Sequence, residues 1–177
     1  MTTLAPTARL GTQPLLEVRK LLERAFDEFG EEDWDHTLGG LHALVRLDGV
    51  LVAHGAVVMR RVLVDGRTLR CGYVESVAVC PTRQRRGLGG RVMEALESLA
   101  EGYDLLALSA SDAGAALYRQ RGWRLWRGPS SSMTPQGLVA TPEDDGGIYV
   151  LAGRPHQRSR LDLDAPIACD WREGDVW

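Results

Sequence analysis

Hydrophobic residues recur along this chain with two periods, which predicts a mixture of strands and helices. Val, Leu and Ala dominate three extended segments between residues 41 and 81. Two Asp-Gly pairs, Asp48-Gly49 and Asp65-Gly66, separate these segments, and such a pair between apolar runs is a strong hairpin signal. Pro81 ends the third segment because proline cannot continue a strand ladder. We therefore expect three antiparallel strands, at Leu41–Leu47, Val50–Val64 and Leu69–Pro81.

Helical spacing flanks these strands on both sides. From Gln13 onward apolar residues repeat every three or four positions, and Gly30 ends the run. The apolar positions of this first helix are Leu15, Val18, Leu22, Ala25, Phe26 and Phe29. We expect a short strand at Thr7–Leu10 before it and, over Glu31–Thr37 after it, a short acidic helix or turn that ends near Gly39-Gly40. A further amphipathic helix is expected where Leu88, Val92, Leu96 and Leu99 share one face.

The second half of the chain predicts shorter elements. We expect strands at Tyr103–Leu108, Trp123–Trp126 and Ile148–Leu151, and a helix at Ala113–Arg121 that Gly122 ends. Residues 128–147 are rich in Gly, Pro and Ser, which predicts a long loop. Residues 154–164 are polar and expected to be irregular. No repeat is visible, so we predict one domain over residues 1–177.

Composition narrows the class of protein. The chain has 177 residues, 44% of them hydrophobic and 25% charged, as in ordinary globular proteins. A net charge of −3 argues against a nucleic-acid partner, and no apolar run reaches the roughly 20 residues that span a bilayer. The N-terminus lacks a signal-peptide pattern, so we expect a cytoplasmic protein. The cysteines and histidines show no ligand spacing, and no metal site is predicted.

The turn between the third strand and the following helix carries the clearest chemistry. It reads Gln84-Arg85-Arg86-Gly87-Leu88-Gly89-Gly90, with Arg83 just before it. Glycines there let the backbone approach a ligand, and a helix N-terminus presents N–H groups that attract phosphate. A P-loop is excluded because no Lys-Ser or Lys-Thr pair follows, and the dinucleotide fingerprint lacks its third glycine. A plain strand-to-helix connection remains the alternative to a pyrophosphate site.

Gln84, Gly87 and Gly89 form a pattern that resembles the acyl-CoA motif of the Gcn5-related N-acetyltransferase (GNAT) superfamily. The resemblance implies an α+β fold in which helices flank a mixed central sheet, with acetyl-CoA as the cofactor. It places the cofactor against Val77, Ala78, Val79, Gln84, Arg85, Arg86, Gly87, Leu88, Gly89 and Gly90.

Acidic residues gather in four places: 28–35, Glu75, 143–145 and the tail from Asp170. Solvated loops and helix N-termini are the alternative explanation for such clusters. The tail also holds Trp171 and Trp177, whereas a frayed end is usually small and polar. Carboxylates beside flat apolar surfaces suit a polycationic sugar.

Five separated blocks are similar to the aminoglycoside 2'-N-acetyltransferases of mycobacteria and related bacteria. They are Glu32–Gly40, Leu69–Glu75, Leu117–Trp123, Thr141–Gly146 and Cys169–Trp177. The resemblance implies transfer of an acetyl group to the 2'-amino group of these antibiotics, which confers resistance, and it implies a homodimer. It also implies that the tail, residues 166–177, folds over the substrate site.

The same resemblance assigns roles to single residues. Glu75 is the general base acting through water, the Val77 N–H polarises the thioester, and Tyr118 is the general acid. A salt-bridged Glu75 and a core-packed Tyr118 are the alternatives. The implied aminoglycoside contacts are Glu28, Asp33, Glu75, Ser76, Ser109, Asp144, Asp175 and Trp177.

Two other functions stay open from the sequence. One is an N-acetyltransferase of another amine, such as a polyamine, a cell-wall amino sugar or a protein N-terminus. The other is a catalytically inactive acyl-CoA-binding module.

Overall fold

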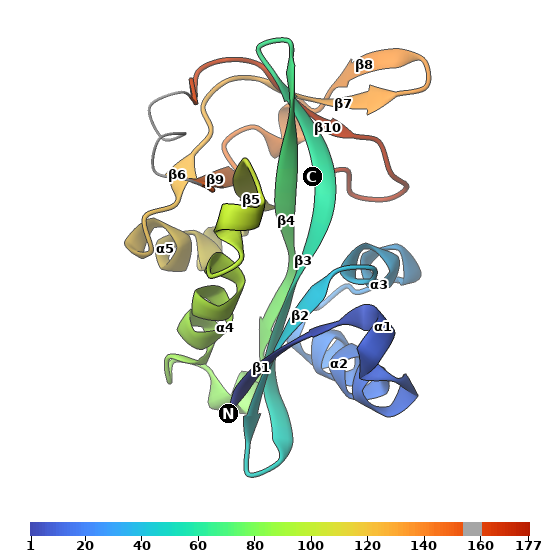
Figure 1. Cartoon of the computed structure of the whole chain (residues 1–177), viewed down its shortest axis with the longest axis vertical. Helices are drawn as coiled ribbons and strands as arrows, with labels where there is room; N and C mark the ends of the chain where they lie inside the picture. Colours follow the sequence, from blue (N-terminus) through green and yellow to red (C-terminus); the bar gives the residue numbers. More distant parts are fainter. Residues whose placement is uncertain (154–160) are drawn as a thin grey trace. The chain divides into compact units, whose positions relative to one another are not determined.

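A computed structural model describes residues 1–153 and 161–177 of the chain (Figure 1). These residues form two compact units. The first unit comprises Met1–Val58 and Val74–Leu99, and the second comprises Met59–Tyr73 and Ala100–Trp177. Strands β3 (Val50–Val64) and β4 (Arg67–Val79) contribute to both units. The single domain expected from the sequence stays a prediction.

In the first unit, two consecutive antiparallel pairings begin the sheet. Strand β1 (Thr2–Pro6) pairs with β2 (Leu41–Leu47), and β2 pairs with β3 in a register that places Leu47 opposite Val50. Asp48 and Gly49 form the turn with positive φ angles of 50° and 80°. This is the backbone that a tight hairpin requires, so the Asp-Gly signal is explained.

Helices cover the strands of the first unit on both faces (Figure 1). Helices α1 (Thr7–Leu10), α2 (Thr12–Ala25) and α3 (Glu31–Thr37) lie on one face, where Val18 and Leu22 pack with Leu44 and Ala78. Helix α4 (Leu88–Glu97), which follows the short helix η1 (Pro81–Arg83), covers the other face. A Cβ on Gly55 would lie 2.7 Å from Val92, so only glycine allows this close packing.

The second unit is built on one mixed sheet with the strand order β6-β9-β5-β4-β3-β10-β7-β8. Strand β5 runs parallel to β4, and β10 runs parallel to β7. Strand β10 pairs antiparallel with β3, β9 pairs antiparallel with β5 and β6, and β7 pairs antiparallel with β8. The remaining strands are β5 (Leu105–Ser109), β6 (Arg124–Leu125), β7 (Ser130–Thr134), β8 (Gly137–Ala140), β9 (Ile148–Ala152) and β10 (Ile167–Asp170). The helical segments of this unit are η2 (Ala100–Gly102), α5 (Asp112–Gln120) and η3 (Pro142–Asp144).

The fold class is confirmed, and several predicted elements occur with the expected bounds. Strands β2 and β3 begin and end where the sequence placed them, and the segment expected to be an acidic helix or turn is helix α3. Two N-terminal predictions are wrong. Thr7–Leu10 is a helical turn, and the first strand precedes it. The first long helix ends at Ala25 because Phe26 adopts an extended backbone, and Phe26 then stacks on Phe29 with ring centroids 6.1 Å apart.

The long loop predicted at residues 128–147 is also wrong, because it contains strands β7 and β8. Ser130 and Ser132 are 3% and 2% exposed, so small hydroxyl side chains fill buried strand positions. The Ser130 hydroxyl lies 2.7 Å from both the carbonyl and the hydroxyl oxygen of Thr141. Hydrogen bonds to Thr141 thus satisfy the buried hydroxyl of Ser130, and the strand shows no hydrophobic alternation. Residues 154–160, part of the segment expected to be irregular, lie outside the described residues.

In residues 1–153 and 161–177, no helix combines the length and apolar character needed to cross a membrane. The same residues contain no group of three or more His, Cys, Asp or Glu side chains arranged to hold a metal ion.

Candidate active site

The glycine turn of the first unit has the geometry of an anion site. Residues 84–87 are exposed, and Arg85 and Gly87 both have positive φ angles, 57° and 75°. Alternating left- and right-handed backbone turns successive N–H groups into a concavity that binds anions. Gly87 caps α4, whose first intrahelical bond joins the Arg91 N–H to the Gly87 carbonyl at 3.1 Å. The N–H groups of Leu88, Gly89 and Gly90 precede that bond and have no acceptor within the helix.

Strand β4 leads into this turn and carries the residues expected to act on the thioester. Glu75, Ser76 and Val77 are half-buried. Ser76 has a φ of 50°, a left-handed conformation that is uncommon for any residue with a Cβ. Its hydroxyl oxygen lies 2.5 Å from that of Thr37. The strand is therefore bent at the residue between Glu75 and Val77.

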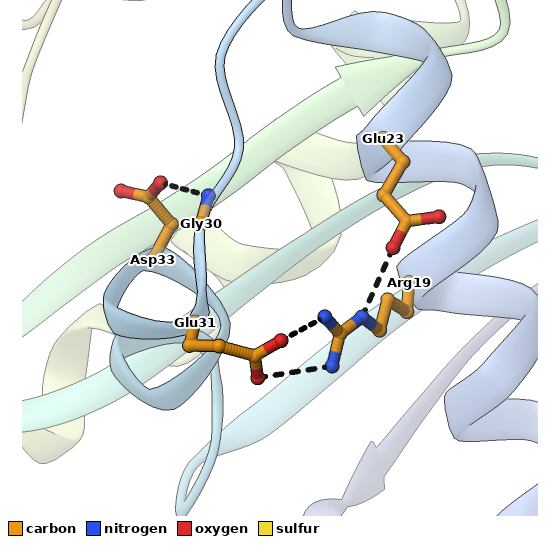
Figure 2. A network of polar contacts seen from close by, with 5 residues as sticks. All are labelled: Arg19, Glu23, Gly30, Glu31 and Asp33. Atoms are coloured by element: carbon orange, nitrogen blue, oxygen red, sulfur yellow. Dashed lines mark hydrogen bonds and ion pairs between the residues drawn. The ribbon is translucent and has the colours of Figure 1, made fainter.

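Figure 2 shows that part of the acidic segment after α2 has a structural role. The Asp33 carboxylate accepts a hydrogen bond of 2.7 Å from the Gly30 N–H and so caps α3. Arg19 on α2 pairs with Glu31 on α3, and this ion pair joins the two helices. Arg19 also pairs with Glu23 of its own helix at 3.0 Å. The Arg19 guanidinium lowers the pKa of Glu31. Glu28 is exposed in the link between the two helices.

In the second unit, Tyr118 lies on α5 within an aromatic cluster. Its ring centroid lies 6.0 Å from that of Trp123 and 6.3 Å from that of Tyr149. The side chain is 8% exposed, and burial raises its pKa to about 12. Tyr118 therefore keeps its proton near neutral pH, as a general acid must, and it also serves as a core residue.

Three residues of the predicted substrate set converge in the second unit. Ser109 ends β5, and Asp144 belongs to η3. Both approach Gly147, because a Cβ placed there would lie 3.5 Å from the Ser109 hydroxyl and 3.4 Å from the Asp144 carbonyl. The pKa of Asp144 is raised by burial first, then by the negative charge of Glu143, with a further contribution from Asp175. An acidic cluster thus forms between η3 and the tail.

The C-terminal tail is folded onto the second unit rather than frayed. Trp177 is 4% exposed, and its ring centroid lies 6.5 Å from that of Tyr73. The guanidinium of Arg60 lies 4.9 Å from the Tyr73 centroid and donates to the Val176 carbonyl at 2.6 Å. Arg172 approaches the same ring at 5.5 Å. Among the described residues, the indole N–H of Trp177 has no hydrogen-bond acceptor.

The predicted site residues therefore fall into two groups. The first unit holds Glu28, Asp33, Glu75, Ser76, Val77, Ala78, Val79 and the whole glycine turn, and the second holds Ser109, Tyr118, Asp144, Asp175 and Trp177. Sequence reasoning missed Arg60 and Tyr73, which hold the tail. It also missed the buried histidines His42 and His54. An arginine or histidine inside a Val-rich strand is the signal that could have marked three of these four residues.

The family model and the relative that match this chain are both acetyltransferases. The model of the acetyltransferase (GNAT) domain matches residues 9–126. An aminoglycoside 2'-N-acetyltransferase of Mycolicibacterium fortuitum is 46% identical over 176 residues, which cover 98% of this chain and 90% of the relative.

Solved structures share the fold at low identity. A GNAT family N-acetyltransferase (YhbS) from Escherichia coli, in complex with CoA, superposes with a TM-score of 0.66 at 18% identity, covering 98% of this chain and 89% of the other. A GNAT family acetyltransferase from Brucella melitensis, in complex with acetyl-CoA, has a TM-score of 0.58 at 20% identity, with coverages of 88% and 90%.

Proposed function

Because this chain belongs to the GNAT acetyltransferases, and among them to the aminoglycoside 2'-N-acetyltransferase family, we propose that it acetylates the 2'-amino group of aminoglycoside antibiotics with acetyl-CoA. Such a reaction would confer resistance. The observation that carries the proposal is the 46% identity to the M. fortuitum enzyme over 98% of the chain.

The glycine turn fits the diphosphate of CoA. Its two left-handed residues and the N-terminus of α4 direct main-chain N–H groups outward, and the exposed side chains of Arg83, Arg85 and Arg86 add positive charge. The proposed cofactor contacts are Val77, Ala78, Val79 and residues 84–90.

Glu75 and Val77 have complementary roles in the proposed reaction. An aminoglycoside amine is protonated near neutral pH, and it must lose a proton before its nitrogen attacks the thioester carbon. Glu75 accepts this proton through water. The Val77 N–H donates to the thioester oxygen and stabilises the negative charge that develops there.

Tyr118 completes the proposed transfer. As the carbon–sulfur bond breaks, its hydroxyl gives a proton to the sulfur that leaves. Burial raises the pKa of Tyr118 to about 12, so the hydroxyl still carries this proton when the sulfur begins to leave. The acetyl group passes directly to the amine, without a covalent enzyme intermediate.

Carboxylates give the proposed substrate site its preference for polycations. Each charge-assisted hydrogen bond contributes roughly 1.5–3 kcal/mol. In the second unit, the negative charge of Asp175 contributes to raising the pKa of Asp144, so the two carboxylates lie near each other, which supports a shared role. The proposed contacts are Glu28, Asp33, Glu75, Ser76, Ser109, Asp144, Asp175 and the terminal carboxylate of Trp177.

We also propose that the enzyme is a cytoplasmic homodimer. Strand β8 lies at an edge of the sheet, and its Leu138 and Val139 are 62% and 51% exposed. An exposed apolar edge strand favours pairing with a second chain. Light scattering of the wild type and of a Leu138→Asp/Val139→Asp variant tests this proposal, because only the variant should be monomeric.

One assay tests the proposed activity. Thiol release from acetyl-CoA is measured with two kanamycin-type sugars that differ only in an amino or a hydroxyl group at the 2' carbon. Turnover of the 2'-amino compound alone supports the proposal. Equal turnover of both rejects the regiochemistry, and no turnover of either rejects aminoglycosides as substrates.

A further inference from the structure

The first unit contains a buried chain of hydrogen bonds through two histidines. His42 on β2 and His54 on β3 are both 0% exposed. His42 Nδ1 lies 2.9 Å from His54 Nε2, and His42 Nε2 lies 2.7 Å from the Thr7 hydroxyl oxygen. At the other end, His54 Nδ1 lies 3.1 Å from the Ser76 carbonyl oxygen on β4. This series of hydrogen bonds thus connects α1 to the bent part of β4.

Geometry and burial determine the direction of these hydrogen bonds. A carbonyl oxygen can only accept, so Nδ1 of His54 carries a proton and donates to Ser76. Burial lowers the pKa of His54 to about 3 and that of His42 to about 4, so both rings are neutral at physiological pH. Nε2 of His54 must then accept from Nδ1 of His42, and Nε2 of His42 accepts from Thr7. Each ring nitrogen has a partner in this single arrangement.

The last acceptor in this series of hydrogen bonds, the carbonyl of Ser76, belongs to a residue with a strained backbone. Ser76 has a φ of 50°, a left-handed conformation that is strained for a residue with a Cβ. Two contacts hold it there: the His54 ring at its carbonyl and the Thr37 hydroxyl at its side chain. Thr37 is itself anchored, because its hydroxyl donates to the Asp33 carbonyl at 2.8 Å. Strain of this kind persists where the surroundings over-determine the backbone, and it clusters at functional sites.

The peptide group that joins Ser76 to Val77 links this anchor to the proposed chemistry. The described chain contains no cis peptide bond, so the carbonyl and the N–H of this planar group point in opposite directions. Fixing the Ser76 carbonyl toward His54 therefore fixes the Val77 N–H away from His54. We propose that His54, supported by His42 and Thr7, is a positioning residue that aims the Val77 N–H at the thioester oxygen. This inference rests on the role of Val77 in the proposed function.

Two substitutions of His54 separate positioning from packing. His54→Leu fills the same space with an apolar side chain but removes the Nδ1–H donor. His54→Asn retains an N–H group in nearly the place of Nδ1. We expect His54→Leu to lower kcat by about 10- to 100-fold, since misplacing a catalytic donor by about 1 Å can cost a factor of this order. The KM for acetyl-CoA should change less than about threefold, and His54→Asn should recover most of kcat. Leu22→Ala, which opens the core of the same unit without touching the hydrogen bonds of the histidines, controls for lost stability and should keep kcat.

A second readout does not require aminoglycoside turnover. In protein labelled with ¹⁵N-valine, the Val77 amide resonance should shift more on adding acetyl-CoA than on adding CoA, because only the acetyl group brings the thioester oxygen. This difference should vanish in His54→Leu and persist in His54→Asn and Leu22→Ala. A wild type that shows the difference but does not acetylate aminoglycosides defeats the proposed function alone. A His54→Leu protein that keeps both kcat and the difference overturns the role of His54.

Discussion

Arg60 joins Asp170 across 110 residues of sequence, with Nε donating to the carboxylate at 2.8 Å. The two terminal nitrogens of the same guanidinium donate to backbone carbonyls, Nη2 to that of Asp170 and Nη1 to that of Val176, both at 2.6 Å. Arg60 is only 5% exposed. One buried arginine on β3 therefore holds both ends of the C-terminal tail.

Replacing this arginine should loosen the tail. Arg60→Met removes all three hydrogen bonds, and we expect it to lower the free energy of unfolding by about 3 kcal/mol, because it breaks a largely buried network. Thermal denaturation and digestion of the tail by carboxypeptidase measure the effect. Arg127→Met is the matched control, since its pair with Asp164 is exposed to solvent and contributes little to stability. Equal stability and equal digestion of the two variants would contradict the role of Arg60.

The tail should matter for the aminoglycoside and not for CoA. Deletion of Asp175–Trp177 removes the Asp175 carboxylate and the buried indole and moves the terminal carboxylate to Gly174, so the KM for aminoglycosides should rise about 100-fold or more. Asp175→Asn should raise it about 10-fold, in line with one charge-assisted hydrogen bond. It should also lower the pKa of Asp144, because Asp175 helps to raise it. Carboxyl titration by NMR and steady-state kinetics check both expectations, and an unchanged KM after the deletion would remove the tail from the substrate site.

Two tyrosines of one aromatic cluster separate catalysis from packing. Tyr118→Phe keeps the ring between Trp123 and Tyr149 and removes the proposed acid, so kcat should fall by about 10²-fold or more. Tyr149→Phe deletes the hydroxyl that accepts from Arg119 at 3.3 Å, and kcat should stay the same. Steady-state kinetics at saturating substrates compare the two. A similar kcat in both variants would leave Tyr118 with its packing role alone.

Two glycines with positive φ angles test the diphosphate site. Gly87 and Gly11 have φ angles of 75° and 67°, each immediately precedes a helix, and nothing lies within 4 Å of a Cβ added to either. Gly87→Ala should cost roughly 1–2 kcal/mol of stability through its left-handed backbone, with a ψ of 5°. Gly11→Ala should cost at least as much, because its ψ of 173° lies in a region that is essentially restricted to glycine. Only Gly87→Ala should weaken CoA binding, by about 10-fold in calorimetry. If Gly11→Ala weakened it equally, the effect would come from lost stability.

The buried histidines should make stability depend on pH. Their pKa values in the folded state, about 4 for His42 and about 3 for His54, lie below the ordinary value of 6.5. The unfolded chain therefore binds more protons as the pH falls below 6.5, and the free energy of unfolding decreases. Each histidine contributes up to about 1.4 kcal/mol per pH unit.

Denaturant unfolding between pH 7 and 4.5 measures this slope, and the window lies above the ordinary pKa of the carboxyl groups. His54→Asn leaves one titrating ring of the pair, so the slope should fall by about half. A flat profile in the wild type would show that the rings are accessible to protons.

The sequence determined those features of this protein that depend on neighbouring residues. The Asp-Gly turn between β2 and β3, the helix Glu31–Thr37 and the glycine turn before α4 were predicted because backbone conformation and apolar period act over a few residues. The predicted roles of Glu75, Val77 and Tyr118 came from resemblance, and they stay predictions.

Tertiary structure alone decided what depends on distant partners. Strand β7 carries buried serines, which form a strand only because β8 and β10 supply its ladder and Thr141 satisfies Ser130. Arg60 finds its partners more than 100 residues away. His54 meets the Ser76 carbonyl only when β3 and β4 lie side by side. Such contacts connect residues that are far apart in sequence, and their energy comes from burial and hydrogen bonding that exist only after the chain has folded.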